Sequence, residues 1–349
     1  MRLTDSRLRP ARRVGTIVRM VMRSIGDIDV SALGLGCWAI GGQFATPDRA
    51  AAGWGEVDDD ESIAAIRRGL ELGVTFFDTA DVYGTGHSEE VLGRALGADR
   101  EGVAIATKFG NTFEEGTGRM TGADLSPGYI RRACQASLRR LGTDRIELYQ
   151  CHVGDLDDAA EEVAGTLEQL HTEGLIRGYG LSTDTLDRAE LWAGRQACVA
   201  IQHVLNVLED APELIALCEN HGLASVNRAP LAMGLLSGKF DADTRLPRSD
   251  VRGSGATWLT AFDADGRPRS EFLDALDAIR DVLTTGGRTL VQGALAWIWA
   301  RSGRTIPIPG FKTVAQVEDS AGALVHGPLG QDAMLEIDGL LRHAPQSAR

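Results

Sequence analysis

The chain has 349 residues, of which 43% are hydrophobic and 24% are charged, and its formal net charge is −13. These proportions are typical of a globular protein and exclude collagen-like and disordered chains. The acidic balance argues against a nucleic-acid-binding surface. The longest apolar stretch, near residues 290–300, is far shorter than the roughly 18–20 residues of a membrane helix. We therefore expect neither nucleic acid nor a membrane among the partners of this protein.

The cysteines and histidines bear on metals and on the cellular compartment. The five cysteines are scattered, and no C-x-x-C pair occurs, so the sequence indicates neither a disulfide framework nor a zinc ribbon. The histidines form no H-E-x-x-H pattern, and we expect no metal site. The cysteine pattern favours a reducing, cytoplasmic location.

The first residues form a basic leader. Residues 1–23 contain seven arginines and one acidic residue, Asp5. Their apolar part is too short for a secretory signal. We expect residues 1–22 either to be disordered or to precede the true start, which would then be Met20 or Met22. Residues 23–345 are expected to form a single domain.

Short β-branched apolar runs then alternate with helical patterns. Eight runs predict strands at residues 33–38, 75–79, 103–108, 147–152, 177–182, 200–204, 224–228 and 305–309. Helices are predicted at residues 60–72, 129–141, 156–173, 186–195, 211–221, 271–283, 290–301 and 314–324. Ser126 and Pro127 provide a cap and a first-turn proline for the second of these helices.

This alternation indicates an α/β fold with a parallel sheet, and eight strands suit a closed (β/α)8 TIM barrel. The surplus length falls in the leader, in extra loops at 42–57 and 241–269, and in a C-terminal helix. These two loops and a third loop, at 111–124, are expected to help build the substrate pocket. The alternative is an open doubly wound sheet, which would carry G-x-G-x-x-G after its first strand. The glycines near Gly36 lack that spacing, so the barrel is favoured.

Polar residues stand where the predicted strands end, which is where a barrel of this kind places its chemistry. They are Asp78, Lys108, His152, Ser182, Gln202 and Arg228, and Tyr83 follows Asp78 by five residues. Lys108 is one of only three lysines among 36 basic residues, the others being Lys239 and Lys312. A lysine retained in so arginine-rich a chain points to a task that needs a compact ammonium group.

Tyrosine, lysine, histidine and aspartate can together build a proton donor. A phenol with a pKa of about 10 holds its proton too tightly for efficient acid catalysis at neutral pH. A nearby ammonium stabilises the phenolate, and we expect it to lower that pKa. No side chain donates hydride, so this set would act on a carbonyl together with a nicotinamide cofactor.

Structural roles stay open for each member of this set. Asp78 could cap a helix, and His152 could be an ordinary core histidine. Lys108 could pair with a surface carboxylate, and Tyr83 could serve only in packing.

Several segments resemble the aldo-keto reductases of the bacterial, NADPH-dependent type. The stretches F-D-T-A-D-V-Y-G at 77–84, A-T-K-F-G at 106–110 and L-Y-Q-C-H at 148–152 carry this resemblance. Further matching segments are S-A-L-G-L-G-C-W at 31–38, G-L-S at 180–182, P-L-A-M-G-L-L-S-G-K at 230–239 and I-P-G at 308–310. The resemblance implies the barrel fold and the reduction of an aldehyde or ketone with NADPH.

The resemblance also implies roles for residues. Tyr83 would be the general acid, and Asp78, Lys108 and His152 would complete the catalytic set. Ser182 and Gln202 would bind the nicotinamide carboxamide, Lys239 would lie near the pyrophosphate, and Lys312 would bind the 2′-phosphate. The full set of implied cofactor residues is Gly36, Cys37, Trp38, Asp78, Ser182, Thr183, Gln202, Arg228, Pro230, Leu231, Gly234, Leu236, Lys239, Ile308, Gly310, Lys312, Thr313, Gln316, Asp319 and Ser320.

Three positions depart from the family pattern. Thr183 stands where asparagine is usual, Arg228 where an aromatic residue commonly stacks on the nicotinamide, and Asp319 with Ser320 where Glu-Asn is common. The Arg228 guanidinium can stack on the ring or bind a polar substrate. The residues expected to line the substrate pocket are Trp38, Trp54, Tyr83, His152 and Trp258.

Other functions remain open at this point. An NADPH-binding regulatory barrel without significant turnover would keep the same residues and could dock a partner through the 241–269 loop. A barrel enzyme with other chemistry, such as sugar isomerisation or lyase activity, is a third reading. The substrate (an aliphatic aldehyde, a keto-sugar or another ketone), the reaction direction and the oligomeric state, homo-oligomers included, are not fixed by the sequence.

Overall fold

The computed structural model describes residues 21–153 and 159–343. Parallel strands form an eight-stranded sheet in the order β12-β11-β10-β9-β8-β5-β4-β3. In chain order they are β3 (Leu35–Gly36), β4 (Phe76–Asp78), β5 (Ala104–Phe109), β8 (Leu148–Cys151), β9 (Tyr179–Ser182), β10 (Cys198–Val204), β11 (Ala224–Arg228) and β12 (Thr305–Pro307). The N–H groups of Gly34 and Gly36 donate to the carbonyl oxygens of Pro307 and Pro309, each at 3.0 Å. These bonds join the first strand to the last, so the predicted (β/α)8 barrel is confirmed.

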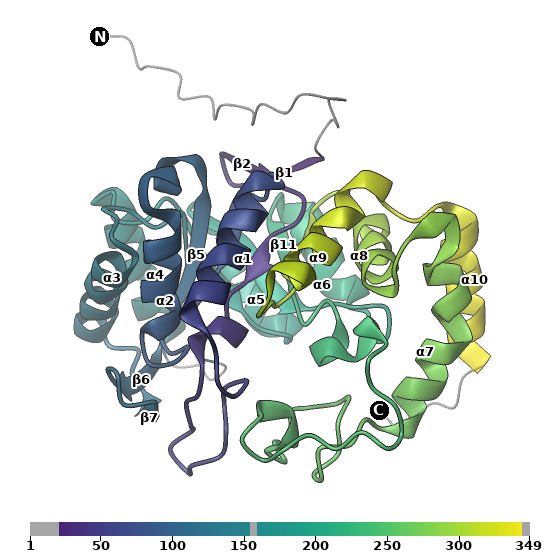
Figure 1. The fold of residues 1–349 in the computed structure, drawn as a ribbon. Helices are drawn as coiled ribbons and strands as arrows, with labels where there is room; N and C mark the ends of the chain where they lie inside the picture. Colours follow the sequence, from purple (N-terminus) through teal and green to yellow (C-terminus); the bar gives the residue numbers. More distant parts are fainter. Residues whose placement is uncertain (1–20, 154–158, 344–349) are drawn as a thin grey trace.

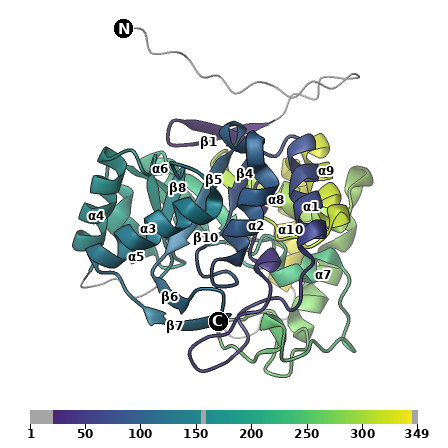
Figure 2. The ribbon, with the colours of Figure 1, turned by 60° about the vertical axis from the view of Figure 1, so that its left-hand side comes forward.

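A helix follows each barrel strand and covers the outside of the sheet (Figures 1 and 2). These helices are α1 (Asp59–Glu71), α2 (His87–Leu96), α3 (Pro127–Leu141), α4 (Ala160–Thr172), α5 (Leu186–Ala193), α6 (Pro212–His221), α8 (Leu290–Arg301) and α9 (Val314–His326). The predicted cap of α3 is confirmed, because the Ser126 hydroxyl accepts the N–H of Tyr129 at 3.3 Å. Residues 1–20 of the expected leader and residues 156–158 of the helix expected at 156–173 lie outside the described residues.

The sequence analysis did not predict α2, and it counted a different helix among those that alternate with the strands. The helix predicted at residues 271–283 forms as α7 (Ser270–Leu283), but it packs beside the barrel on the predicted C-terminal helix, α10 (Gln331–His343) (Figure 1). The apolar pattern of α2 is broken by Glu89, which is fully buried. Its carboxylate accepts hydrogen bonds from Thr107 at 2.6 Å and from Arg140 at 2.7 Å. A buried and fully paired charge thus hides a helix from a hydrophobicity pattern.

A β-hairpin that the sequence analysis did not predict closes the N-terminal end of the barrel. Strands β1 (Met22–Ile25) and β2 (Ile28–Ser31) pair antiparallel and lie opposite the mouth (Figure 1). Ile25, Ile28 and Val30 are buried against the residues that fill the barrel interior. With this end plugged by apolar side chains, a ligand can enter only from the other end of the strands.

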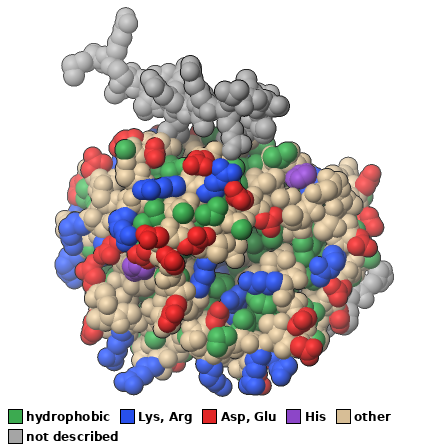
Figure 3. All heavy atoms as spheres, viewed as in Figure 1, with side chains coloured by type: hydrophobic (Ala, Val, Ile, Leu, Met, Phe, Trp, Pro, Cys, Tyr) green, Lys and Arg blue, Asp and Glu red, His purple; other side chains and the backbone are tan. Residues whose placement is uncertain are grey.

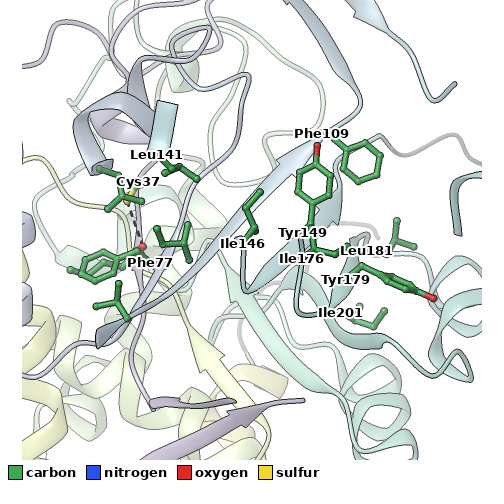
Figure 4. Packing of buried hydrophobic residues seen from close by; sticks show 14 of the residues in the cluster. Cys37, Phe77, Phe109, Leu141, Ile146, Tyr149, Ile176, Tyr179, Leu181 and Ile201 are labelled. Atoms are coloured by element: carbon green, nitrogen blue, oxygen red, sulfur yellow. Dashed lines mark hydrogen bonds between the residues drawn. The ribbon is translucent and has the colours of Figure 1, made fainter. Parts of the chain in front are cut away.

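Strand alternation divides the core into an inner and an outer layer. In β4, Phe76 belongs to the cluster inside the barrel, and Phe77 belongs to the cluster between the sheet and the helices, as successive strand residues must. Figure 4 shows part of the outer cluster, in which Phe109 and Tyr149 pack with ring centroids 4.7 Å apart. This apolar layer fixes the strands and therefore the side chains at their ends.

Three segments surround the C-terminal end of the strands. Residues 111–124, expected as a loop, form a hairpin of β6 (Asn111–Glu114) and β7 (Arg119–Ala123). Residues 42–57 and 241–269 lie side by side below the strands in Figures 1 and 2. The N–H of Val251 donates to the carbonyl oxygen of Gly53 at 2.8 Å and joins the two. Together these segments form the walls of the barrel mouth.

Candidate active site

An ion pair inside the barrel links two neighbouring strands. Asp78 ends β4, Lys108 lies in β5, and Lys108 Nζ stands 2.5 Å from Asp78 Oδ1. The ammonium also donates to the carbonyl oxygen of Thr79 at 2.7 Å. Lys108 is fully buried and Asp78 is 2% exposed, so each charge depends on the other for its stabilisation. Asp78 therefore holds Lys108 and does not cap a helix, and the partner of Lys108 is not a surface carboxylate.

Tyr83 presents its hydroxyl to the same ammonium. The Tyr83 Oη lies 3.5 Å from Lys108 Nζ, and the ring stacks on Trp38 with centroids 5.8 Å apart. The turn depends on Gly84, whose φ is +63° and where a Cβ atom would stand 1.9 Å from the carbonyl oxygen of Gly41. Only glycine fits this position, because it combines a left-handed backbone with a close approach to another backbone.

His152 follows β8 and packs against the ring of Tyr83. Its ring is edge-on to Tyr83, with centroids 5.8 Å apart and an interplanar angle of 85°. Burial lowers the pKa of His152 well below 6.5, and the charges of Lys108 and Arg228 lower it further. His152 is therefore neutral near pH 7 and carries a single N–H.

The expectation of a lowered phenol pKa for Tyr83 is wrong. Burial raises the pKa of Tyr83 above 10 and outweighs the opposing charge of Lys108. Burial acts to lower the pKa of Lys108, but the Asp78 carboxylate and the Tyr83 hydroxyl outweigh it and raise that pKa above 10.5. At neutral pH the phenol is protonated and the lysine is charged, which are the forms required before a proton is donated.

Two buried glutamines bind the second oxygen of Asp78. Gln202 Nε2 lies 2.7 Å and Gln150 Nε2 lies 3.3 Å from Asp78 Oδ2. The amide group of Gln202, expected to face a carboxamide, is therefore partly engaged within the protein. The sequence analysis missed Gln150, although it stands two residues before His152, a spacing that places side chains on one face of a strand.

A cleft of about 1390 Å³ opens at the mouth of the barrel. This exceeds the roughly 300–1,000 Å³ of ordinary small-molecule sites and suits an extended ligand such as a dinucleotide. The expected site residues that line it are Gly36, Trp38, Trp54, Asp78, Tyr83, His152, Ser182, Thr183, Gln202, Arg228, Pro230, Leu231, Gly234, Lys239, Trp258, Ile308, Gly310, Lys312, Gln316, Asp319 and Ser320. Four expected residues do not line it, namely Cys37, Lys108, Leu236 and Thr313.

Each of these four residues has a structural explanation. Lys108 is fully buried, and its ammonium contacts the hydroxyl of Tyr83. Cys37 is fully buried, and burial raises the pKa of its thiol. Leu236 packs in the apolar cluster beside α8. The Thr313 hydroxyl caps α9 by accepting the N–H of Gln316 at 3.4 Å. Cys37, Leu236 and Thr313 each stand next to a residue that lines the cleft, but they do not line it themselves.

Lys312 marks the end of the cleft that lies beside the N-terminus of α9. Its Nζ donates to the carbonyl oxygens of Trp54 and Glu56. The ammonium thus fastens the 42–57 segment to the connection between β12 and α9. A lysine beside a helix N-terminus has the chemistry of a phosphate site, and here its hydrogen bonds go to the protein backbone.

Two further expected cofactor residues also have partners within the protein. Asp319 accepts hydrogen bonds from the Thr289 hydroxyl at 2.7 Å and from Gln292 at 3.3 Å. The Lys239 ammonium lies 4.9 Å from the ring centroid of Phe240. Both side chains still border the cleft.

Arg228 ends β11 at the mouth and forms an ion pair with Asp184. Asp184 Oδ1 also accepts the backbone N–H of Val204 at 2.7 Å. The sequence analysis did not select Asp184. Its position two residues after Ser182, on the adjoining loop, was the signal that could have found it.

Tryptophans form the wall of the cleft next to Tyr83. Trp38 packs against Trp54 and Trp258, with ring centroids 5.3 Å and 6.2 Å apart. Trp258 is 56% exposed. Trp38 Nε1 donates to the carbonyl oxygen of Ala52 at 2.9 Å, which fixes its ring. The three tryptophans expected in the substrate pocket are thus brought together.

Arg252 fastens the 241–269 segment across the mouth. Its guanidinium pairs with Asp250 at 2.6 Å and lies 4.5 Å from the Trp54 ring centroid. Both charged side chains are buried, and both line the cleft. The sequence analysis missed this pair. The segment that it considered as a docking surface thus contributes side chains to the cleft.

Within residues 21–153 and 159–343, no group of three or more histidine, cysteine or acidic side chains could hold a metal ion. None of the helices in that part of the chain is long and apolar enough to cross a membrane. Acidic and basic side chains are interspersed on the face drawn in Figure 3.

Comparison with known proteins agrees with this geometry. The profile described as "Aldo/keto reductase family" matches residues 32–342. Probable aldo-keto reductase 1 of Glycine max is 31% identical over 300 residues, which are 85% of this chain and 81% of that protein. The glycerol dehydrogenase of Gluconobacter oxydans superposes with a TM-score of 0.79 at 30% identity, over 94% of this chain and 98% of that one. An aldo-keto reductase of Klebsiella pneumoniae, solved in complex with NADPH, superposes with a TM-score of 0.66 at 26% identity, over 94% and 97% of the two chains.

Proposed function

Because this chain belongs to the aldo/keto reductase family of oxidoreductases, we propose that it reduces an aldehyde or a ketone to the alcohol with NADPH. The observation that carries the proposal is the convergence of Tyr83, Lys108, Asp78 and His152 at one end of a cleft large enough for a dinucleotide. The NADPH complex of the Klebsiella pneumoniae relative supports the choice of cofactor.

Each member of this group has a distinct task in the proposed reaction. Bound in the cleft, NADPH would supply the hydride for the carbonyl carbon. Tyr83 donates its phenol proton to the carbonyl oxygen, and the Lys108 ammonium stabilises the phenolate that remains. Asp78 holds Lys108 in place, since its carboxylate is the buried counter-charge. His152, neutral at pH 7, orients the carbonyl oxygen by donating a hydrogen bond.

The chain offers residues for both ends of the dinucleotide. Ser182 ends β9 and Gln202 lies in the neighbouring strand β10. Both suit the carboxamide of the nicotinamide, and Lys239 is suited to the pyrophosphate. Lys312 and the N-terminus of α9 suit the 2′-phosphate. Because Lys312 binds the backbone of the 42–57 segment, it must exchange those carbonyl oxygens for phosphate oxygens.

The substrate enters beside the tryptophans. Trp38, Trp54 and Trp258 form an apolar wall next to the Tyr83 hydroxyl, which supports a small-molecule carbonyl compound as the substrate. The five cysteines are free and buried, which agrees with the cytoplasmic location that we propose.

A carbonyl panel tests the proposal. The protein is incubated with NADPH and a set of aliphatic aldehydes, keto-sugars and ketones, and both the oxidised cofactor and the product are quantified. We expect one alcohol formed per NADPH oxidised with at least one class of substrate. Product formation without NADPH oxidation would indicate isomerase or lyase chemistry. NADPH binding without turnover on any substrate would indicate a regulatory protein.

A further inference from the structure

The ion pair of Arg228 and Asp184 has no task in the reaction proposed above. Arg228 ends β11 and Asp184 follows β9, so the pair spans the end of β10, which lies between those strands. The Asp184 carboxylate is fixed there by the N–H of Val204. The Arg228 side chain is 35% exposed and the Asp184 side chain is 51% exposed. The pair is therefore anchored at the mouth and only partly screened by solvent.

Arg228 lines the same cleft as Tyr83 and His152. Ser182 and Gln202 line it as well. Burial is the largest influence on the pKa of Tyr83 and of His152, and the Arg228 charge acts on both as a further influence that lowers the pKa. The Arg228 charge therefore also acts on a ligand that binds in the cleft next to Tyr83 and His152.

The nicotinamide ring must lie within this reach. The carbonyl carbon is one bond away from the oxygen that Tyr83 protonates, and reacting atoms approach to about 3–3.5 Å before transfer. The reduced ring is neutral, whereas the oxidised ring is a cation. A fixed guanidinium therefore repels the oxidised ring and leaves the reduced ring nearly unaffected.

We propose that the Arg228–Asp184 pair sets the relative affinity of this chain for oxidised and reduced cofactor. The guanidinium disfavours NADP⁺, and the Asp184 carboxylate limits that effect by partial neutralisation. The pair thereby favours loading with NADPH and release of NADP⁺ after reduction. This inference rests on the proposed function, because it requires that the chain bind NADP(H).

The proposal is tested by measuring the dissociation constants of NADP⁺ and NADPH separately, by calorimetry, without any carbonyl compound. For Arg228→Gln the ratio Kd(NADP⁺)/Kd(NADPH) falls by about three- to tenfold, the size expected for one unit charge that acts at a partly solvated site. For Arg228→Lys, which keeps the charge, the ratio stays within about twofold of the wild-type value.

Removal of the partner charge moves the ratio in the opposite direction. Asp184→Asn retains an oxygen that can accept the N–H of Val204 but loses the negative charge, so the ratio rises by about two- to threefold. The double variant Arg228→Gln/Asp184→Asn falls between the two single variants. A structural role would instead shift both dissociation constants together, and in the same direction for both variants.

A matched control pair lies at the opposite end of the barrel. Arg177 pairs with Asp27 at 2.9 Å, and their side chains are 38% and 79% exposed. Arg177→Gln and Asp27→Asn change the same charges and leave the ratio unchanged.

Two results would overturn the proposal: an unchanged ratio in Arg228→Gln, or shifts of the same sign in Arg228→Gln and Asp184→Asn. The proposed function fails in a different way: the wild-type protein would bind neither dinucleotide, or it would bind NADPH and reduce no compound of the carbonyl panel.

Discussion

The two ends of the cleft are built in different ways. At the end proposed to donate the proton, Lys108 Nζ and Asp78 Oδ1 are buried inside the barrel, 2.5 Å apart, on two strands of one sheet. At the end proposed to bind phosphate, Lys312 is half-buried, and its ammonium binds backbone oxygens of the 42–57 segment. The charges of the first end are paired with each other, whereas in our proposal the second end must exchange its partners for a phosphate. Substitutions should therefore separate turnover from cofactor affinity.

The largest effect is expected when the buried ion pair is broken. Lys108→Met leaves the Asp78 carboxylate buried without its cation, and we expect the free energy of unfolding to fall by about 3–5 kcal/mol. Turnover is lost as well, because the phenol loses its ammonium neighbour. Chemical denaturation measures the stability. The double variant Lys108→Met/Asp78→Asn removes both charges and should recover part of the loss; a double variant no more stable than Lys108→Met would contradict the pairing.

The phosphate end responds to Lys312→Ala with a loss of affinity only. Loss of a charge-assisted hydrogen bond to the 2′-phosphate should raise the Kd of NADPH about tenfold or more. The Kd of NADH, which lacks that phosphate, should change little. Wild type and Lys312→Ala are each titrated with NADPH and with NADH, and quenching of tryptophan fluorescence gives the four dissociation constants. An equal loss of affinity for NADPH and NADH would instead indicate that Lys312 acts only by holding the 42–57 segment in place.

A smaller effect of the opposite sign is expected at Glu61. Its carboxylate accepts the N–H of Val314 at 2.9 Å, at the N-terminus of α9. A negative charge there repels the 2′-phosphate, so Glu61→Gln should tighten NADPH by about two- to fivefold and leave NADH unchanged. Tighter binding of both cofactors, or weaker binding of NADPH, would contradict the proposal that the Glu61 carboxylate repels the 2′-phosphate.

The pH dependence should show little change near neutrality. The proposed reduction needs the protonated form of Tyr83 and the neutral form of His152. Burial raises the pKa of Tyr83 above 10 and lowers that of His152 well below 6.5. We therefore expect kcat/KM for the carbonyl compound, at saturating NADPH, to stay level between about pH 6.5 and pH 10. The rate should fall only beyond that range, and an inflection near pH 6.5 that disappears in His152→Gln would contradict a buried, neutral histidine.

Strand positions could be predicted from the sequence, whereas the partners of several polar side chains could not. The eight strands and the residues at their ends could be predicted because a short apolar run fixes where a strand ends, and barrel strands present those ends to one mouth. Gln150 and Asp184 were missed although each stands two residues from an expected site residue, because the side chains that they bind become their neighbours only in the fold. The pairing of Asp250 with Arg252 was missed because it depends on where a long loop folds back.

Two elements escaped prediction for reasons of packing. The helix α2 carries Glu89 on its buried side, so tertiary pairing outweighed the pattern of its apolar residues. The β1–β2 hairpin has only a few apolar residues, and their burial depends on the open end of the barrel. The pKa of Tyr83 was predicted in the wrong direction because the sequence supplies the neighbouring charge but not the degree of burial.

The most direct test of the separation between the two ends is made on one preparation of Tyr83→Phe. This variant keeps the aromatic ring and loses only the hydroxyl. We expect turnover of the carbonyl substrate to fall by at least about 10²–10⁴-fold, the usual contribution of a positioned acid, while the Kd of NADPH stays within about twofold of the wild-type value. Wild-type turnover in this variant would contradict the account of Tyr83 as the proton donor. A loss of NADPH binding as large as the loss of turnover would contradict the separation of the two ends.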